Sequence, residues 1–307
     1  MWARWVAFCS RTEAGTSIAV FRIAMGLCVM LTVGWVIAAD LVDVIWVDAA
    51  YGGMSVVHPS WWVAQLGGPT PAVMRGLAWA GVGAGALLAL GLGGRLTALV
   101  TLVLVQCTVD INGEAGGSYD ELLQNGLWLC VLGPTTTTLS LDCWLRTRRF
   151  TSDAPVGVWA RYLIVIQLVV MYGSTGLQKL SSYWTPGGDF SALYYILQQP
   201  SWHRFDMRWL AYVFPLTQLA TAVSWFWEVF APVWLLAFHY SATADQPGRA
   251  RAFFVRWHVR EVYALIGLVF HGSLLVLMDV GPFSPISLAF YAALVHPWEW
   301  RTLARRP

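Results

Sequence analysis

Long apolar stretches alternate with short polar segments along this chain. A helix needs roughly 20 apolar residues to cross about 30 Å of hydrocarbon, and most of the stretches reach that length. They cover residues 17–39, 74–92, 95–111, 121–141, 158–180, 210–238, 261–279 and 283–297. The sixth contains Pro215 and Pro232, so it predicts either one kinked span or two shorter ones. The pattern predicts an all-α transmembrane helical bundle of about eight spans, in a single domain over residues 1–307.

The composition excludes an ordinary soluble domain. Hydrophobic residues make up 57% of the chain and charged residues only 12%. Soluble domains carry about 25% charged residues, so this surface fits contact with lipid, and we expect a polytopic membrane protein. Residues 81–94 are dense in glycine within an apolar stretch, where small residues favour close helix packing.

Arginines concentrate in alternate connecting segments, which sets the expected orientation. The positive-inside rule places these segments, and with them both termini, in the cytoplasm. The net charge of +2 then comes from a face that suits an anionic inner leaflet, so membrane lipid is an expected partner and nucleic acid is not. The arginines of this set are Arg4, Arg11, Arg95, Arg146, Arg148, Arg149, Arg249, Arg251, Arg256, Arg260, Arg301, Arg305 and Arg306.

Lys179 is the only lysine among the 19 lysine and arginine residues, and it lies at the expected outer end of the stretch 158–180. An ammonium group can lose its proton when it leaves water, whereas a guanidinium in practice cannot. Among these cations, Lys179 is therefore the candidate base or nucleophile near neutral pH. The alternative is an amine that only reaches the lipid headgroups, as basic residues at helix ends often do. Tyr172 and either Thr175 or Gly176 share its helix face, because residues three and four apart lie above one another.

Two aromatic segments accompany Lys179 at the expected outer face. Residues 181–209 contain Pro186 and many aromatic side chains, and residues 44–73 have the same character. Long loops of this kind are commonly interfacial segments or functional lids. Together the two segments are expected to roof a cavity at the outer leaflet.

A polar cluster before the stretch 121–141 is a second candidate for chemistry. Ser118 and Glu121 have the spacing of a helix capping box, and Asp120 also favours a helix N-terminus. Asp120 and Gln124, like Glu121 and Asn125, continue a polar stripe into the apolar span, which capping does not require. Both a structural and a functional interpretation stay open.

His271 lies about midway along the stretch 261–279. A lone histidine facing a helix bundle either acts as an acid or base or only donates hydrogen bonds within the packing, and both remain open. The chain has no CxxC pair, HExxH, P-loop or GxGxxG motif in a suitable context, so no metal or nucleotide site is expected. No structural disulfide is expected either, since the five cysteines fall in spans or cytoplasmic segments.

Five segments together resemble a known family. They read FRIAMG at 21–26, GGSYDELLQNGLWLCVLGP at 116–134, GLQKLSSYWTPGG at 176–188, WEVFAPVWLL at 227–236 and FHGSLLVLMDVGPFSPISLAFYAALV at 270–295. In this order and spacing they resemble the horizontally transferred transmembrane (HTTM) domain family. That family includes the membrane part of vitamin K-dependent gamma-carboxylase and bacterial relatives such as the maturation protein for the sporulation-delaying toxin.

The resemblance implies that Lys179 is a base that deprotonates a reduced quinone of the menaquinone or vitamin K type. QKL followed by Tyr183-Trp184 lies where the carboxylase has its lysine motif, and His271 resembles a histidine of the family's late helix. Two departures weigh against glutamate carboxylation itself. Gly117 stands where the family has a histidine before the Ser-Tyr pair, and within these 307 residues we expect no counterpart of the large extracytoplasmic domain that engages the carboxylase's substrate.

Two hypotheses of different classes follow. The first is an integral membrane enzyme, a carboxylase-like lyase or quinol-linked oxidoreductase, that modifies a peptide or small substrate at the outer face of a bacterial cytoplasmic membrane. The second is a non-catalytic membrane factor that binds a secreted peptide or its precursor and helps it mature or leave the cell. The predicted catalytic residues are Lys179, His271, Asp120 and Glu121. The residues predicted to bind the substrate or quinone are Tyr119, Tyr172, Gln178, Trp184, Arg22 and Glu228.

The arginine pattern makes a prediction about orientation. Cysteines introduced at Gly117 and Ser182 should react with an impermeant thiol reagent added to intact cells, whereas one at Gly248 should react only after the membrane is opened. The parent chain, with its own five cysteines, gives the background signal. Labelling of the Gly248 position in intact cells would reverse the predicted orientation.

Overall fold

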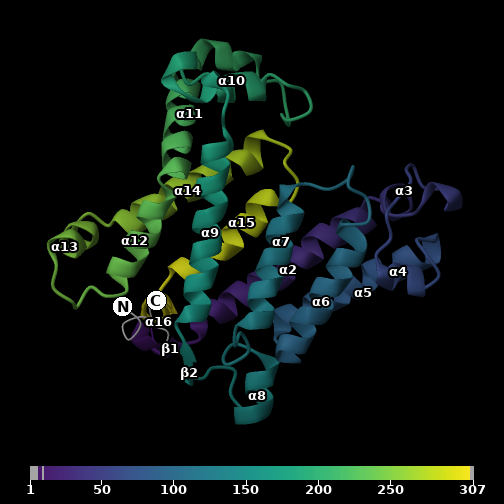
Figure 1. Cartoon of the computed structure of the whole chain (residues 1–307), viewed down its shortest axis with the longest axis horizontal. Helices are drawn as coiled ribbons and strands as arrows, with labels where there is room; N and C mark the ends of the chain where they lie inside the picture. The colour runs from purple at the N-terminus through teal and green to yellow at the C-terminus, as the bar shows by residue number, and fades with distance from the viewer. Residues whose placement is uncertain (1–5, 9, 305–307) are drawn as a thin grey trace. The chain divides into compact units, whose positions relative to one another are not determined.

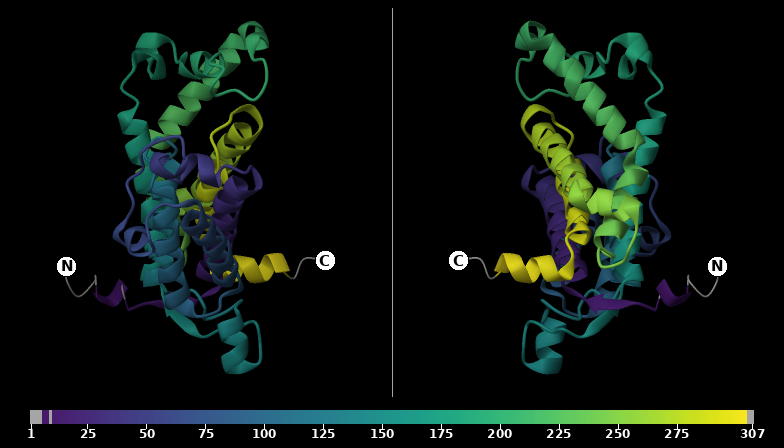
Figure 2. Two further views of the ribbon diagram at one scale, coloured as in Figure 1. Left: turned by 90° about the vertical axis from the view of Figure 1, so that its right-hand side faces the viewer. Right: turned by 90° about the vertical axis from the view of Figure 1, so that its left-hand side faces the viewer.

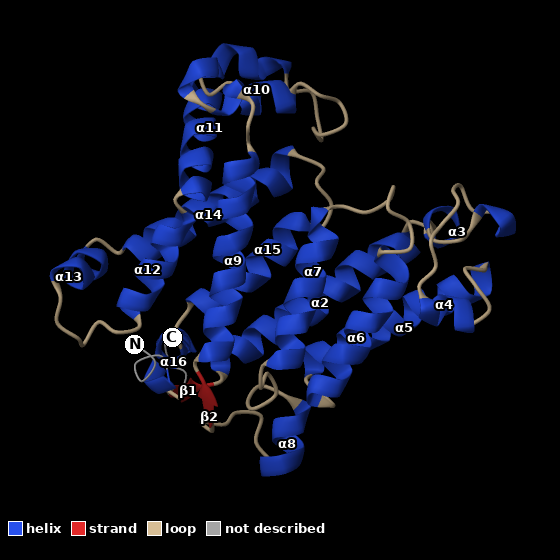
Figure 3. Ribbon diagram, viewed as in Figure 1, coloured by secondary structure: helices blue, strands red, loops and turns tan. Residues whose placement is uncertain are grey.

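The computed structural model describes residues 6–8 and 10–304, which are mostly helical and include one short two-stranded sheet (Figures 1 and 3). The chain divides into two compact units. Unit 1 comprises residues 1–164 and 285–307, and unit 2 comprises residues 165–284. Helices α9 (Trp159–Gln178) and α15 (Phe283–Phe290) each run across a boundary between the two.

Unit 1 contains the described elements before α9 and those after α15. They are β1 (Thr12–Ala14), α2 (Thr16–Ala38), α3 (Val42–Ile45), η1 (Ala49–Tyr51), α4 (Trp61–Gln65), α5 (Pro71–Leu90), α6 (Gly94–Val109), α7 (Ser118–Leu132), α8 (Leu141–Thr147), β2 (Pro155–Gly157), η5 (Tyr291–Leu294) and α16 (Pro297–Ala304). β1 and β2 pair antiparallel.

Unit 2 contains the rest of α9 and the elements that follow it. They are η2 (Ser182–Trp184), η3 (Pro186–Gly188), α10 (Ala192–Leu197), η4 (Arg208–Val213), α11 (Phe214–Val229), α12 (Ala231–Ser241), α13 (Arg249–Arg256) and α14 (Val259–Leu277). In Figure 2 the teal segment after α9 turns at the upper end of the view and α11, in green, runs back from it.

Four helices of unit 1 pack against one another, α2 on α5, α5 on α6 and α6 on α7, and α7 also contacts α2 (Figure 1). Gly26 of α2 permits the close approach of α5. A Cβ atom at Gly26 would lie 2.6 Å from the carbonyl oxygen of Gly85 and 2.6 Å from the amide nitrogen of Ala89. The glycine-dense stretch 81–94 therefore packs closely, as predicted.

Arg22 on α2 is fully buried within unit 1. Its guanidinium donates hydrogen bonds to the carbonyl oxygens of Thr135 at 2.8 Å, Leu139 at 2.6 Å and Ala89 at 3.2 Å. Two of these carbonyls belong to the irregular segment after α7, where a helix does not satisfy them. The contacts thus give Arg22 a packing role, and they add nothing to its predicted role in ligand binding.

Arg161, in the first turn of α9, ties the two ends of unit 1 to that helix. It is buried and pairs with Glu13 of β1 through two hydrogen bonds of 2.7 and 2.6 Å. The same guanidinium donates to the Ala293 carbonyl at 3.2 Å and lies 3.0 Å from Nδ1 of His296. A bidentate arginine–carboxylate pair is among the stronger hydrogen-bonded contacts, so it fixes both segments.

Four helices of the described residues are long and apolar enough to cross a membrane, namely α2, α5, α9 and α14, and they indicate a membrane protein. The helical run of η4 and α11 makes an angle of 62° with α12, and the two parts together would count as a fifth span. α6 and the run from α15 through η5 are apolar but shorter. The predicted stretch 121–141 does not form one long helix, because α7 ends at Leu132 before Gly133 and Pro134. The all-α class is confirmed, and the number of eight spans is not.

The predicted interruption of residues 210–238 lies at Phe230, between α11 and α12. Pro232 is in the first turn of α12, where a missing amide hydrogen costs no helical bond. The Tyr263 hydroxyl of α14 donates to the Phe230 carbonyl at 3.1 Å, and Nε1 of Trp227 donates to the Tyr263 carbonyl at 3.0 Å. α14 therefore supports the bend through two hydrogen bonds, one of them to a carbonyl that also accepts from the Val233 amide at 2.9 Å.

The N-terminus of α7 differs by one residue from the predicted capping box. Gly117 is the N-cap, and the Asp120 carboxylate accepts a hydrogen bond of 2.9 Å from the Gly117 amide. The predicted box of Ser118 and Glu121 is wrong, because the extended backbone of Gly117 starts the helix at Ser118 and leaves Glu121 exposed.

Candidate functional site

Lys179 and Glu228 form an ion pair within unit 2. Lys179 lies just beyond the end of α9, and Glu228 lies in the last turn of α11. The Lys179 side chain is 15% exposed and that of Glu228 is 3% exposed. Nζ of Lys179 also lies 4.2 Å from the centre of the Trp184 ring, within the range of a cation–π contact. The amine therefore has a carboxylate and an aromatic face as partners and little contact with water.

Gly176 allows the two helices to come close enough for this pair. A Cβ atom at Gly176 would lie 2.7 Å from the Val229 amide nitrogen and 2.8 Å from Cβ of Glu228. Such distances are shorter than real Cβ contacts, so any larger residue would push α11 away from α9. The glycine is thus a structural requirement for the contact between Lys179 and Glu228.

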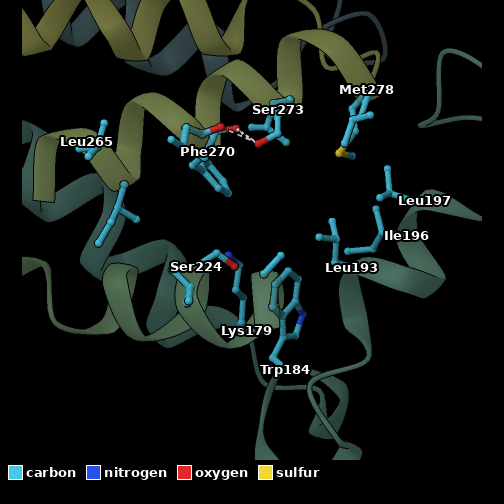
Figure 4. A pocket seen from close by; sticks show the side chains of 16 residues that line it. Lys179, Trp184, Leu193, Ile196, Leu197, Ser224, Leu265, Phe270, Ser273 and Met278 are labelled. Atoms are coloured by element: carbon cyan, nitrogen blue, oxygen red, sulfur yellow. Dashed lines mark hydrogen bonds between the residues drawn. The ribbon is translucent and has the colours of Figure 1, made fainter. Parts of the chain in front are cut away.

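An apolar pocket of about 430 Å³ lies beside the pair, and Lys179 and Trp184 form part of its wall (Figure 4). Leu265, Phe270 and Ser273 of α14 form the wall opposite, and further lining comes from α10 and α11. Pockets for drug-sized ligands measure roughly 300–1,000 Å³ and are mostly apolar with a few polar groups. Lys179 is the only charged side chain among the described residues that line this one.

The edge of the pocket lies at the surface of unit 2. Leu265 is 61% exposed and Val269 is 63% exposed, and both belong to the candidate span α14. Apolar side chains that are exposed along a membrane-spanning helix contact lipid. Acyl chains or lipid-soluble molecules are therefore the natural neighbours of the pocket edge.

The segment between α9 and α11 forms part of the pocket wall. Leu193, Ile196 and Leu197 of α10 line the pocket, so residues 181–209 contribute to a cavity wall, whereas their predicted place at the outer leaflet stays a prediction. The Leu193 amide donates to Thr221 of α11 at 3.2 Å, which fixes α10 on that helix. Arg204 also donates to the Met278 carbonyl at 2.7 Å, joining the same segment to the end of α14. The segment 44–73, predicted to share this task, belongs to unit 1.

His271 lies in a buried chain of hydrogen bonds next to this site. Its Nε2 is 2.6 Å from the Tyr172 hydroxyl, and its Nδ1 is 3.2 Å from the Ser284 hydroxyl. His271 and Ser284 are fully buried and Tyr172 is nearly so. The Tyr172 ring packs on Trp227, at 4.3 Å between ring centres, and Trp227 directly precedes Glu228. None of the three hydrogen-bonded residues lines the pocket, so their contacts support a positioning role.

The remaining predicted site residues lie apart from this arrangement or in the other unit. Gln178 is exposed and does not line the pocket. Tyr119, Asp120 and Glu121 belong to unit 1 with Arg22. Burial raises the pKa of the Asp120 carboxyl to about 6, against the opposing effect of its hydrogen bond from Gly117.

The sequence marks each member of the ion pair but not their contact. Lys179 stands out as the sole lysine, and Glu228 is the only carboxylate between Trp209 and Ala244. Their contact joins residues 49 positions apart in the chain, a pairing that neither local pattern specifies. The polar stripe at Gln124 leads elsewhere, to Asp110 at 2.6 Å and Gln106 at 3.2 Å within unit 1.

Comparisons with protein-family models, with curated proteins and with solved structures found no match to this chain. The resemblance to the HTTM family therefore rests on the five sequence segments. Among the described residues, no group of three or more His, Cys, Asp and Glu side chains is placed to hold a metal ion.

The close contact at Gly176 leads to a paired prediction. Gly176→Ala should separate α9 from α11 and expose the Lys179 amine, so a water-soluble amine reagent should modify Lys179 several-fold faster than in the parent chain. Gly173→Ala is the matched control, because a Cβ atom at Gly173 meets nothing within 4 Å. Mass spectrometry of the peptide with the single lysine gives the rate. Equal rates in both variants would contradict the role assigned to Gly176.

Proposed function

We propose that this chain is a multi-pass enzyme of the cytoplasmic membrane that takes a proton from a lipid-soluble hydroxyl compound of the quinol class. Lys179 is the proposed base. The observation that carries the proposal is the Lys179 amine, paired with buried Glu228, in the wall of an otherwise apolar pocket. An ionisable pair in such surroundings is a functional candidate because burying it is costly and contributes little net stability.

The residues present fit a reduced quinone on two counts. The aliphatic side chains of α10 and α14 would hold its apolar part, and Lys179 with Trp184 would contact its polar ring. The exposed edge at Leu265 and Val269 would admit it from the bilayer. When bound, a reduced quinone would supply an acidic hydroxyl group and two electrons.

Glu228 has a defined part in this proposal. Removal from water favours the neutral amine, which can accept a proton at Nζ, and the carboxylate favours the ammonium that results. Glu228 would therefore stabilise Lys179 after it has taken the proton. Its carboxylate could also accept the proton from the Lys179 ammonium. The low exposure of the Lys179 side chain, 15%, would keep most bulk water from the amine, as general-base catalysis by a buried lysine requires.

One observation favours a second candidate, in which the site only recognises its ligand. The ammonium form of Lys179 already has two partners, the Glu228 carboxylate and the Trp184 ring, so it is stable without any reactant. In that case the chain would be a membrane factor that binds a secreted peptide or its precursor, and the same pocket would contribute affinity alone.

Replacement of Lys179 distinguishes the two candidates. With the protein in lipid nanodiscs and reduced menaquinone added under air, the rate of quinone formation should fall by about 10²–10⁴-fold in Lys179→Arg, the usual contribution of a general base. Arginine keeps the charge and approximate length but cannot supply a neutral amine. Arg208→Gln is the matched control, because it removes an exposed cation whose only described partner is Asp206.

Membrane level and thermal stability are measured in the same preparations. A wild-type rate in a well-folded Lys179→Arg protein would exclude Lys179 as the base and favour the recognition candidate. No quinone formation above the lipid background in the parent chain would contradict the quinol proposal itself.

A further inference from the structure

We propose that Lys179 is also a covalent attachment site for an apolar aldehyde, which it holds as a protonated imine with Glu228 as the counterion. This inference does not depend on the quinol proposal. It rests on three features of unit 2: a single buried amine, a carboxylate in direct contact with it, and an apolar pocket that the amine lines.

The reaction balances without any oxidant or reductant. Glu228 takes one proton from the Lys179 ammonium, and the free Nζ attacks the carbonyl carbon, so that a C–N bond forms as the C=O π bond breaks. The carbonyl oxygen then leaves as water with two protons, one of them returned by Glu228. The product carries one hydrogen and one positive charge on the nitrogen, the same charge as the ammonium at the start.

The partners of Lys179 select this product over other adducts. A protonated imine keeps the positive charge that Glu228 and the Trp184 ring contact, so both interactions survive the reaction. An acyl group on Nζ would instead remove the charge and leave Glu228, only 3% exposed, without a counterion. A buried carboxylate that has lost its partner is strongly unfavourable, which disfavours acyl donors here.

The pocket defines the class of aldehyde. Aliphatic and aromatic side chains of α10, α11 and α14 form its walls, and the volume of about 430 Å³ is that of a site for a drug-sized molecule. Entry past the exposed side chains of Leu265 and Val269 favours a molecule dissolved in the bilayer. A long-chain aldehyde meets these conditions, and a small water-soluble aldehyde gains nothing from the pocket.

The test uses hexadecanal as the probe, with the full chain in lipid nanodiscs. Borohydride reduces an imine to a stable secondary amine, and mass spectrometry of the lysine peptide measures the fraction modified.

The matched control is a Lys179→Arg chain that also carries Arg208→Lys, since the Arg208 side chain is 86% exposed. At equal concentration, hexadecanal should modify Lys179 at least ten-fold more than the lysine at 208. Propanal should show no such preference. Equal modification by hexadecanal at the two positions would overturn the proposal.

Two variants separate the contributions of the carboxylate and the pocket. Glu228→Gln should lower the yield of the hexadecanal adduct several-fold, because the imine loses its counterion. Val269→Trp should block the pocket edge and lower the yield with hexadecanal but not with propanal, and it keeps the ion pair. An undiminished hexadecanal yield in folded Val269→Trp would show that the adduct forms outside the pocket. None of these measurements uses a quinol, so either proposal can fail alone.

Discussion

The pairing of one ammonium with one carboxylate in apolar surroundings is the constraint on which the site depends. Neither Lys179 nor Glu228 would be stable alone at its position, because a buried charge without a partner is strongly unfavourable. The contact needs Gly176, which lets α11 approach α9. The buried chain from Ser284 through His271 to Tyr172 supports the same contact, since Tyr172 packs on Trp227.

The pair explains why the position holds a lysine in a chain that otherwise uses arginine. Arginine would form a stronger bidentate contact with Glu228, so a purely structural ion pair would favour it. Only lysine can exchange a proton with the carboxylate and present a neutral nitrogen to a ligand. Both the proposed proton transfer and the proposed imine use that property, and both place the reacting nitrogen in the wall of a pocket whose edge on α14 is exposed.

The sequence predicted features that depend on local pattern and composition. The helical class, the break near Pro232 and the contribution of residues 181–209 to a pocket wall follow from apolar runs, proline and a long aromatic segment. Features that depend on distant contacts were not predictable. Glu228 was expected to bind a ligand, but its partner is set by a contact 49 residues away. The expected span 121–141 was longer than the helix that forms, because Pro134 follows the apolar run and α7 ends at Leu132. Hydropathy alone does not specify where a helix ends.

Nuclear magnetic resonance of the Lys179 side chain tests the central claim most directly. A chain grown with ¹⁵N-labelled lysine gives a single side-chain Nζ signal, because Lys179 is the only lysine. If the amine is paired with Glu228 and shielded from water, its hydrogens should exchange slowly and its shift should move in Glu228→Gln, while Arg208→Gln leaves the signal unchanged. A rapidly exchanging signal that resembles free lysine and does not respond to Glu228→Gln would contradict the account.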